Sequence, residues 1–83
     1  MAAHYDRLDK ILHVVEEEVL EAVSNHEPFN SAHEGFAVLL EEVDELWDEV
    51  RKREKSRPEM AREAVQVAAM AIRFLHDICR EAV

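Results

Sequence analysis

Three glutamates, Glu42, Glu45 and Glu63, are spaced so that they could hold one metal ion between two helices. Residues three apart share a helix face, so Glu42 and Glu45 can bind an ion from adjacent turns. Glu63 lies on the next predicted helix, and Gln66 follows one turn later with an amide oxygen. Oxygen ligands without Cys or His at metal spacing favour a hard cation, so we expect Mg²⁺, with Mn²⁺ as an alternative.

The same acidic pairs also fit a simpler explanation, which is a solvated helix face. Carboxylates three residues apart are common on exposed helices, where they bind nothing. These glutamates, however, lie beside apolar positions rather than at the centre of a polar face, and a carboxylate beside a core carries a desolvation cost. This placement adds support to the metal site, and the solvated helix face stays open as the alternative.

Apolar residues that recur every three or four positions predict three helices and no strands. The predicted helices cover residues 5–23, then Asn30 or Ser31 to about Lys52, and then Ser56 to the C-terminus. Breaker residues (SNHEP) follow the first helix.

The starts of the second and third helices carry the clearest local signals. Ser31 and Glu34 have the spacing of a capping box, and Ser56 and Glu59 repeat it. Pro58 adds a proline in the first turn of the third helix.

The apolar residues of these helices exceed what one short chain can cover. The second helix carries a stripe of six: Leu39, Leu40, Val43, Leu46, Trp47 and Val50. The third has a wide, alanine-rich apolar sector, and 83 residues supply only a small core. We therefore predict one all-α domain over residues 1–83, an antiparallel helical bundle completed by homo-oligomerisation to a dimer or tetramer.

Charge and composition exclude several classes of function. A net charge of −9 argues against nucleic acid and against anionic membrane surfaces. An acidic protein that handles phosphates would need a divalent cation to bridge the like charges. One cysteine excludes an intramolecular disulfide, and no segment resembles a membrane span or a signal peptide, so we expect a soluble, cytoplasmic protein.

Two segments together resemble the MazG-like all-α nucleoside triphosphate pyrophosphohydrolases. They are His33–Leu46, which contains EExxEL, and Arg62–Ala68, which contains ExxQ. The resemblance covers roughly residues 31–75, and the family signature is ExxE on one helix and ExxD on the next. Glu42 and Glu45 match the first motif and Glu63 matches the first acid of the second.

The resemblance implies Mg²⁺-dependent cleavage of a nucleoside triphosphate to its monophosphate and pyrophosphate, a reaction used to cleanse nucleotide pools. Glu45 or Glu41 would position the attacking water. Gln66 stands where the family usually has Asp, which removes one negative charge from the site. A non-catalytic helical oligomer or protein-interaction module on the same scaffold is therefore the alternative function.

Further substrate-binding candidates lie around the end of the second helix. Arg53 and Lys55 belong to a run with five basic residues in seven, 51–57, which could reach a triphosphate. The alternative is that this run complements the helix dipole and forms the pairs Asp48–Lys52 and Glu49–Arg53. Trp47 could wall a nucleobase pocket or belong to the core.

Overall fold

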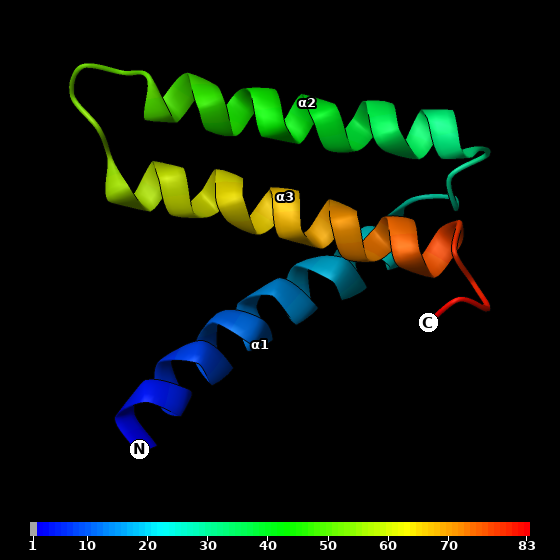
Figure 1. The fold of residues 1–83 in the computed structure, drawn as a ribbon, viewed down its shortest axis with the longest axis horizontal. Coiled ribbons are helices and arrows are strands. Elements are labelled where there is room, and N and C mark those ends of the chain that lie inside the picture. The colour runs from blue at the N-terminus through cyan, green and yellow to red at the C-terminus, as the bar shows by residue number, and fades with distance from the viewer. Residues whose placement is uncertain (1) are drawn as a thin grey trace.

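Three helices make up the described chain, as predicted, and residues 2–83 contain no strand. The computed structural model describes residues 2–83, with side chains from Asp6 onward. The helices are α1 (Ala2–Asn25), α2 (Ala32–Val50) and α3 (Arg57–Asp77). Figure 1 shows α2 and α3 side by side as an antiparallel hairpin, with α1 running obliquely and packing against α3.

Both predicted helix starts are confirmed by capping hydrogen bonds. The Ser31 hydroxyl accepts from the Glu34 N–H at 3.1 Å, and the Ser56 hydroxyl accepts from the Glu59 N–H at 3.3 Å. In a standard capping box the Glu side chain accepts from the backbone N–H of the capping serine. Here the Glu34 carboxylate accepts instead from the N–H of the preceding residue, Asn30, at 2.7 Å. This cap therefore also fixes the residue before Ser31, at the end of the loop after α1.

The end of α3 differs from the prediction, which extended it to the C-terminus. The helix ends at Asp77, and the N–H of the capping residue Ile78 donates to the Phe74 carbonyl at 2.9 Å. Residues 80–83 are exposed, so no tertiary packing compensates for the cost of continuing the helix there. The helical segment α1 is also longer at both ends than the predicted 5–23.

The core is small and lies where the C-terminal part of α1 meets α3. Its fully packed cluster contains Ala22, Phe29, Ala69 and Met70. Gly35 of α2 belongs to the same region: a Cβ added there would lie 2.7 Å from the Phe74 ring. Glycine at this position therefore lets an aromatic ring pack directly against the α2 backbone.

The predicted apolar stripe of α2 divides into an inner and an outer part. Leu39 and Leu46 are half-buried toward α3, whereas an outer stripe is exposed. We call this outer set the α2 stripe: Phe36, Leu40, Val43 and Trp47. Trp47 is 58% exposed and Phe36 is 60% exposed, so neither belongs to the core of this chain.

A second stripe on α3 has the same four-three-four spacing. This α3 stripe contains Ala64, Ala68, Ala71 and Leu75, of which Ala68 is half-buried and the others exposed. It lies away from the buried positions Ala69 and Arg73, which face α1 and the loop after it. None of the described helices combines the length and the hydropathy that a bilayer span requires.

Candidate metal centre and adjoining cavity

The structure brings the three glutamates together between α2 and α3. One carboxylate oxygen from each of Glu42, Glu45 and Glu63 lies within 4.8 Å of the other two. Glu42 and Glu63 are half-buried, and Glu45 is exposed. The antiparallel hairpin accounts for this arrangement, because it places the middle of α2 opposite the first half of α3.

The pKa of Glu42 is raised from its ordinary value of 4.5 to about 6. Burial is the largest cause, followed by the negative charge of Glu45, a hydrogen bond with the Glu45 carboxyl group and the charge of Glu63. The site therefore concentrates negative charge in a place where solvent screens it incompletely. A divalent cation between the carboxylates would relieve this repulsion.

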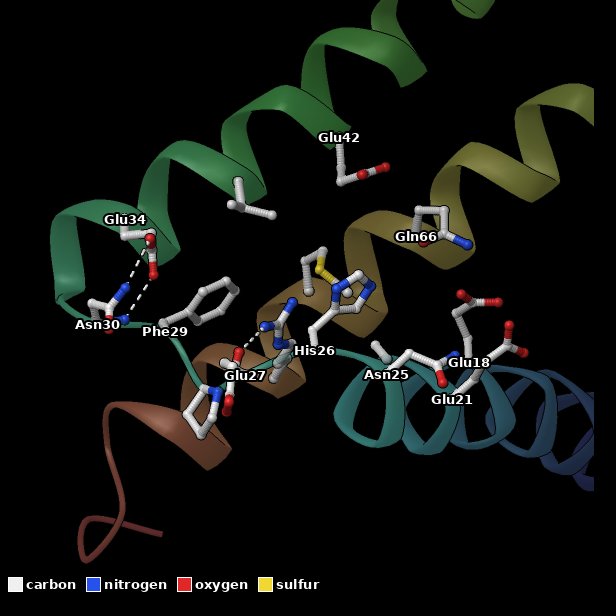
Figure 2. Close-up of a pocket in the computed structure, with 15 residues that line it drawn as sticks. Glu18, Glu21, Asn25, His26, Glu27, Phe29, Asn30, Glu34, Glu42 and Gln66 are labelled. Atoms are coloured by element: carbon white, nitrogen blue, oxygen red, sulfur yellow. Dashed lines mark hydrogen bonds between the residues drawn. The ribbon is translucent and has the colours of Figure 1, made fainter.

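Gln66 lies on α3, across the space between the two helices from Glu42 (Figure 2). It is half-buried, and with Glu42 it forms one end of a cavity. Figure 2 shows the Glu42 side chain on α2 directed into the gap, with Gln66 on α3 across from it. Gln66 therefore shares the cavity wall with Glu42, and its role as a fourth oxygen ligand stays a prediction.

The cavity measures about 510 Å³ and lies between the last turns of α1, the loop after it, and the α2–α3 hairpin. This volume falls in the range of small-molecule sites. Its wall combines apolar groups with amides and carboxylates. The polar residues that line it are Glu18, Glu21, Asn25, His26, Glu27, Asn30, Glu34, Glu42, Gln66 and Arg73. Of the three glutamates Glu42 lines the cavity, whereas Glu45 and Glu63 do not, so a ligand there would reach the candidate metal centre through Glu42.

A buried arginine, Arg73, holds the loop that forms the cavity wall. Its guanidinium donates to the Glu27 carbonyl at 2.8 Å and stacks over the Phe29 ring at 4.1 Å from the centroid. Its Nε lies 3.4 Å from the Asp77 carboxylate. Sequence reasoning missed this residue, although a basic side chain inside an apolar sector with an acid four positions later is a usable signal.

Asp77 completes the same network from the end of α3. Its carboxylate accepts from the Phe29 N–H at 3.1 Å and lies 2.7 Å from the His76 ring nitrogen. Burial acts to raise the pKa of Asp77, but these hydrogen bonds and the charge of Arg73 outweigh it and hold the pKa below its ordinary value. The loop backbone is thus attached to α3 through two side chains.

Other predicted site residues lie outside this arrangement. Glu41 is exposed and does not belong to the group of three carboxylates, although its charge adds to the raised pKa of Glu42. Trp47, Arg53 and Lys55 are also exposed, and none of them lines the cavity.

The basic run after α2 makes different ion pairs from those predicted. Arg51 pairs with Asp48 and Lys52 pairs with Glu49, both at 2.9 Å. The predicted pairs assumed four-residue spacing on a continuous helix. Because α2 ends at Val50, Arg51 and Lys52 are not part of a continuing helix, and each forms its ion pair with the acidic residue three positions earlier.

No protein-family model matches the chain, and no curated protein or solved structure is significantly similar to it. The resemblance to the MazG-like enzymes therefore rests on the ExxE and ExxQ motifs and their spacing.

Proposed function

We propose that the protein is a Mg²⁺-dependent nucleoside triphosphate pyrophosphohydrolase. The observation that carries the proposal is the meeting of Glu42, Glu45 and Glu63 within 4.8 Å beside a cavity of about 510 Å³. A triphosphate needs a divalent cation to approach a protein with net charge −9, and the carboxylates supply the oxygen ligands that Mg²⁺ prefers.

In the proposed reaction, the acidic residues and Gln66 have separate roles. Mg²⁺ held by the three carboxylates would neutralise phosphate oxygens and polarise the scissile phosphorus. Glu45, the exposed member, faces solvent and is the group best placed to orient an attacking water. Glu41, one turn earlier and outside the group, is the second candidate for that task. Gln66 contributes an amide oxygen toward the cation or its bound water.

Turnover of a nucleotide panel tests the proposal. Phosphate release that requires both Mg²⁺ and added pyrophosphatase identifies pyrophosphate as the product. We expect Glu42→Gln and Glu63→Gln to abolish it, while Glu17→Gln, an exposed position on α1 outside the site, leaves it unchanged. Release of no pyrophosphate from any nucleotide, or unchanged turnover in Glu42→Gln, would contradict the enzymatic function.

We further infer that the α2 and α3 stripes pack against a second copy of the chain. Both stripes are free of charge, and their four-three-four spacing is the repeat by which helices interlock in bundles. The alanines of α3 leave room for large side chains such as Trp47 of a second copy. Phe36, Leu40, Val43 and Trp47 are all large apolar side chains left exposed along one face of α2, and contiguous exposed apolar residues mark interaction surfaces.

Sedimentation tests the assembly independently of turnover. The wild type should sediment as a dimer or tetramer at micromolar concentration, and Val43→Lys should shift it toward monomer. Glu41→Lys, at an exposed position of α2 that is not three or four residues from any member of the α2 stripe, is the matched control. A stable wild-type monomer would contradict the inference.

The exposed stripes and the amide at Gln66 also favour the second candidate function, a non-catalytic helical oligomer. An assembled protein that hydrolyses no nucleotide and binds no divalent cation would identify this alternative.

A further inference from the structure

The first half of α1 projects beyond the rest of its chain. Figure 1 shows the C-terminal part of α1 against α3 and the N-terminal part diverging from it. Every side chain from Asp6 to Val14 is exposed, whereas Val15 and Ala22 on the following turns are buried. Most helical stability in proteins comes from packing against other elements. Its own chain therefore leaves this part of α1 without the packing that would stabilise it.

One face of α1 carries charged and apolar side chains in a symmetrical order. We call it the α1 face, and it consists of Arg7, Lys10, Ile11, Val14, Glu18 and Glu21. Steps of three or four residues connect its members, which keeps them on one side of the helix. Arg7 and Glu21 lie seven positions on either side of Val14, and Lys10 and Glu18 lie four. The face is therefore basic at one end, apolar in the middle and acidic at the other.

We propose that the α1 face binds the α1 face of a second copy in an antiparallel arrangement, with the two-fold axis at Val14. Arg7 of each copy then lies beside Glu21 of the other, and Lys10 beside Glu18. The apolar side chains at the centre of the face, which are exposed in one copy, cover one another. A two-fold interface has to be complementary to itself, and the symmetrical order of the α1 face meets this condition. Because Glu18 and Glu21 also line the cavity of about 510 Å³, the second copy brings two basic side chains to its edge.

Charge identifies a second copy as the occupant of this face. Arg7 and Lys10 are the only lysine or arginine among the first 50 residues, whereas residues 14–25 carry four glutamates and no lysine or arginine. A parallel arrangement would bring acid against acid, and a partner of uniform charge would match only one end of the face. Within residues 6–83, none of the four charged side chains of the α1 face forms an ion pair, so all four are available to a partner.

A groove beside the α1 face has room for apolar side chains of the second copy. It measures about 290 Å³ and lies between α1 and the first half of α3. Val14 and Glu18 line it from α1, and Ala61 and Val65 contribute to its α3 wall. In the antiparallel arrangement, Ile11 and Val14 of the second copy lie opposite this part of α1 and would fill the groove.

This contact is separate from the one made by the α2 and α3 stripes. It uses none of their residues, and Figure 1 shows α1 and α2 on opposite sides of α3. A chain that makes both contacts assembles as a tetramer. The contact does not depend on nucleotide hydrolysis.

Sedimentation of the Val43→Lys protein tests this contact alone, because that substitution removes the contact of the α2 stripe. We expect a dimer at micromolar concentration and low salt, where charges are least screened. Arg7→Glu/Lys10→Glu and Glu18→Lys/Glu21→Lys each give the α1 face a single sign of charge. Added to Val43→Lys, each should therefore raise the dissociation constant of the dimer about 100-fold or more.

An equimolar mixture of the two charge variants should restore the dimer, because an acidic α1 face then meets a basic one. Asp9→Lys/Glu16→Lys lies on the opposite side of α1, makes the same change in net charge as Glu18→Lys/Glu21→Lys, and should keep the dimer. Monomeric Val43→Lys protein, charge variants that remain dimers, or a mixture that stays monomeric would each overturn the proposal.

Disulfide crosslinking of the full chain gives a second readout that needs no charge reversal. Cys79→Ser removes the native thiol, and Val14→Cys then places one thiol on the two-fold axis. Oxidation should link two copies through Val14→Cys, whereas Asp9→Cys, on the opposite side of α1, should stay unlinked at the same concentration. Equal linkage at the two positions, or none through Val14→Cys, would overturn the antiparallel contact.

Discussion

The guanidinium of Arg73 lies 4.1 Å from the centroid of the Phe29 ring, which fixes the loop after α1 to the end of α3. The hydrogen bond from Arg73 to the Glu27 carbonyl joins residues 46 positions apart in the chain. Arg73 therefore connects the loop that forms part of the cavity wall to the C-terminal half of α3.

We expect Arg73→Met to lower the free energy of unfolding by about 3 kcal/mol, since it leaves a buried acid without its cation. That acid is Asp77, whose side chain is only 3% exposed. Urea denaturation gives the value, and Arg80→Met, at an exposed position, should change it by less than about 0.5 kcal/mol. Equal effects of the two substitutions would show that the network contributes little.

Gly35→Ala should also destabilise the fold, by about 1–3 kcal/mol, because overpacking forces neighbouring groups to move. The added Cβ would stand 2.7 Å from Phe74 and 3.0 Å from Phe29. On an exposed helix the same change stabilises, by about 1 kcal/mol, so the sign of the effect is informative. Thermal unfolding measures it, and adding Phe74→Leu should recover part of the loss. A more stable Gly35→Ala protein would disprove the close packing.

Local signals in the sequence predicted the helices well. Serine caps, a first-turn proline and regular apolar spacing act over a few residues, and both capped starts are present. The meeting of Glu42, Glu45 and Glu63 also followed from spacing, given an antiparallel hairpin.

Properties that depend on long-range packing were not predictable in the same way. Periodicity placed Leu39 and Trp47 on one stripe, but only the position of α3 decides that the first turns inward and the second outward. The role of Arg73 required the location of a loop far away in sequence. The early end of α3 depended on the exposure of residues 80–83.

The stability of the protein without metal should depend on pH through Glu42. Its carboxyl pKa is raised from 4.5 to about 6 on folding, so the folded chain binds more protons between these values. Stability should therefore fall as the pH rises from 4.5 to 6, and the loss should persist above 6. The difference in melting temperature between wild type and Glu42→Gln, followed from pH 4.5 to 7.5, isolates this contribution. A difference that does not vary with pH would contradict the crowding of the three carboxylates.

Gln66→Asp should act in opposite directions with and without Mg²⁺. With the ion, a fourth carboxylate should tighten its binding by about tenfold, equivalent to ~1.4 kcal/mol. Without the ion, the added charge beside Glu42 and Glu63 should lower the melting temperature through repulsion. Melting temperatures measured in both conditions test this, and equal shifts would place Gln66 outside the metal centre.

Binding of Mn²⁺, followed by the loss of the free-ion EPR signal, tests the metal centre most directly. The wild type should bind Mn²⁺ saturably at millimolar concentrations or below, and excess Mg²⁺ should release it. Glu42→Gln and Glu63→Gln should each weaken this binding, whereas Glu17→Gln should bind as the wild type does. If the wild type binds Mn²⁺ no better than the Glu42→Gln/Glu63→Gln double variant, the three glutamates do not form a metal centre.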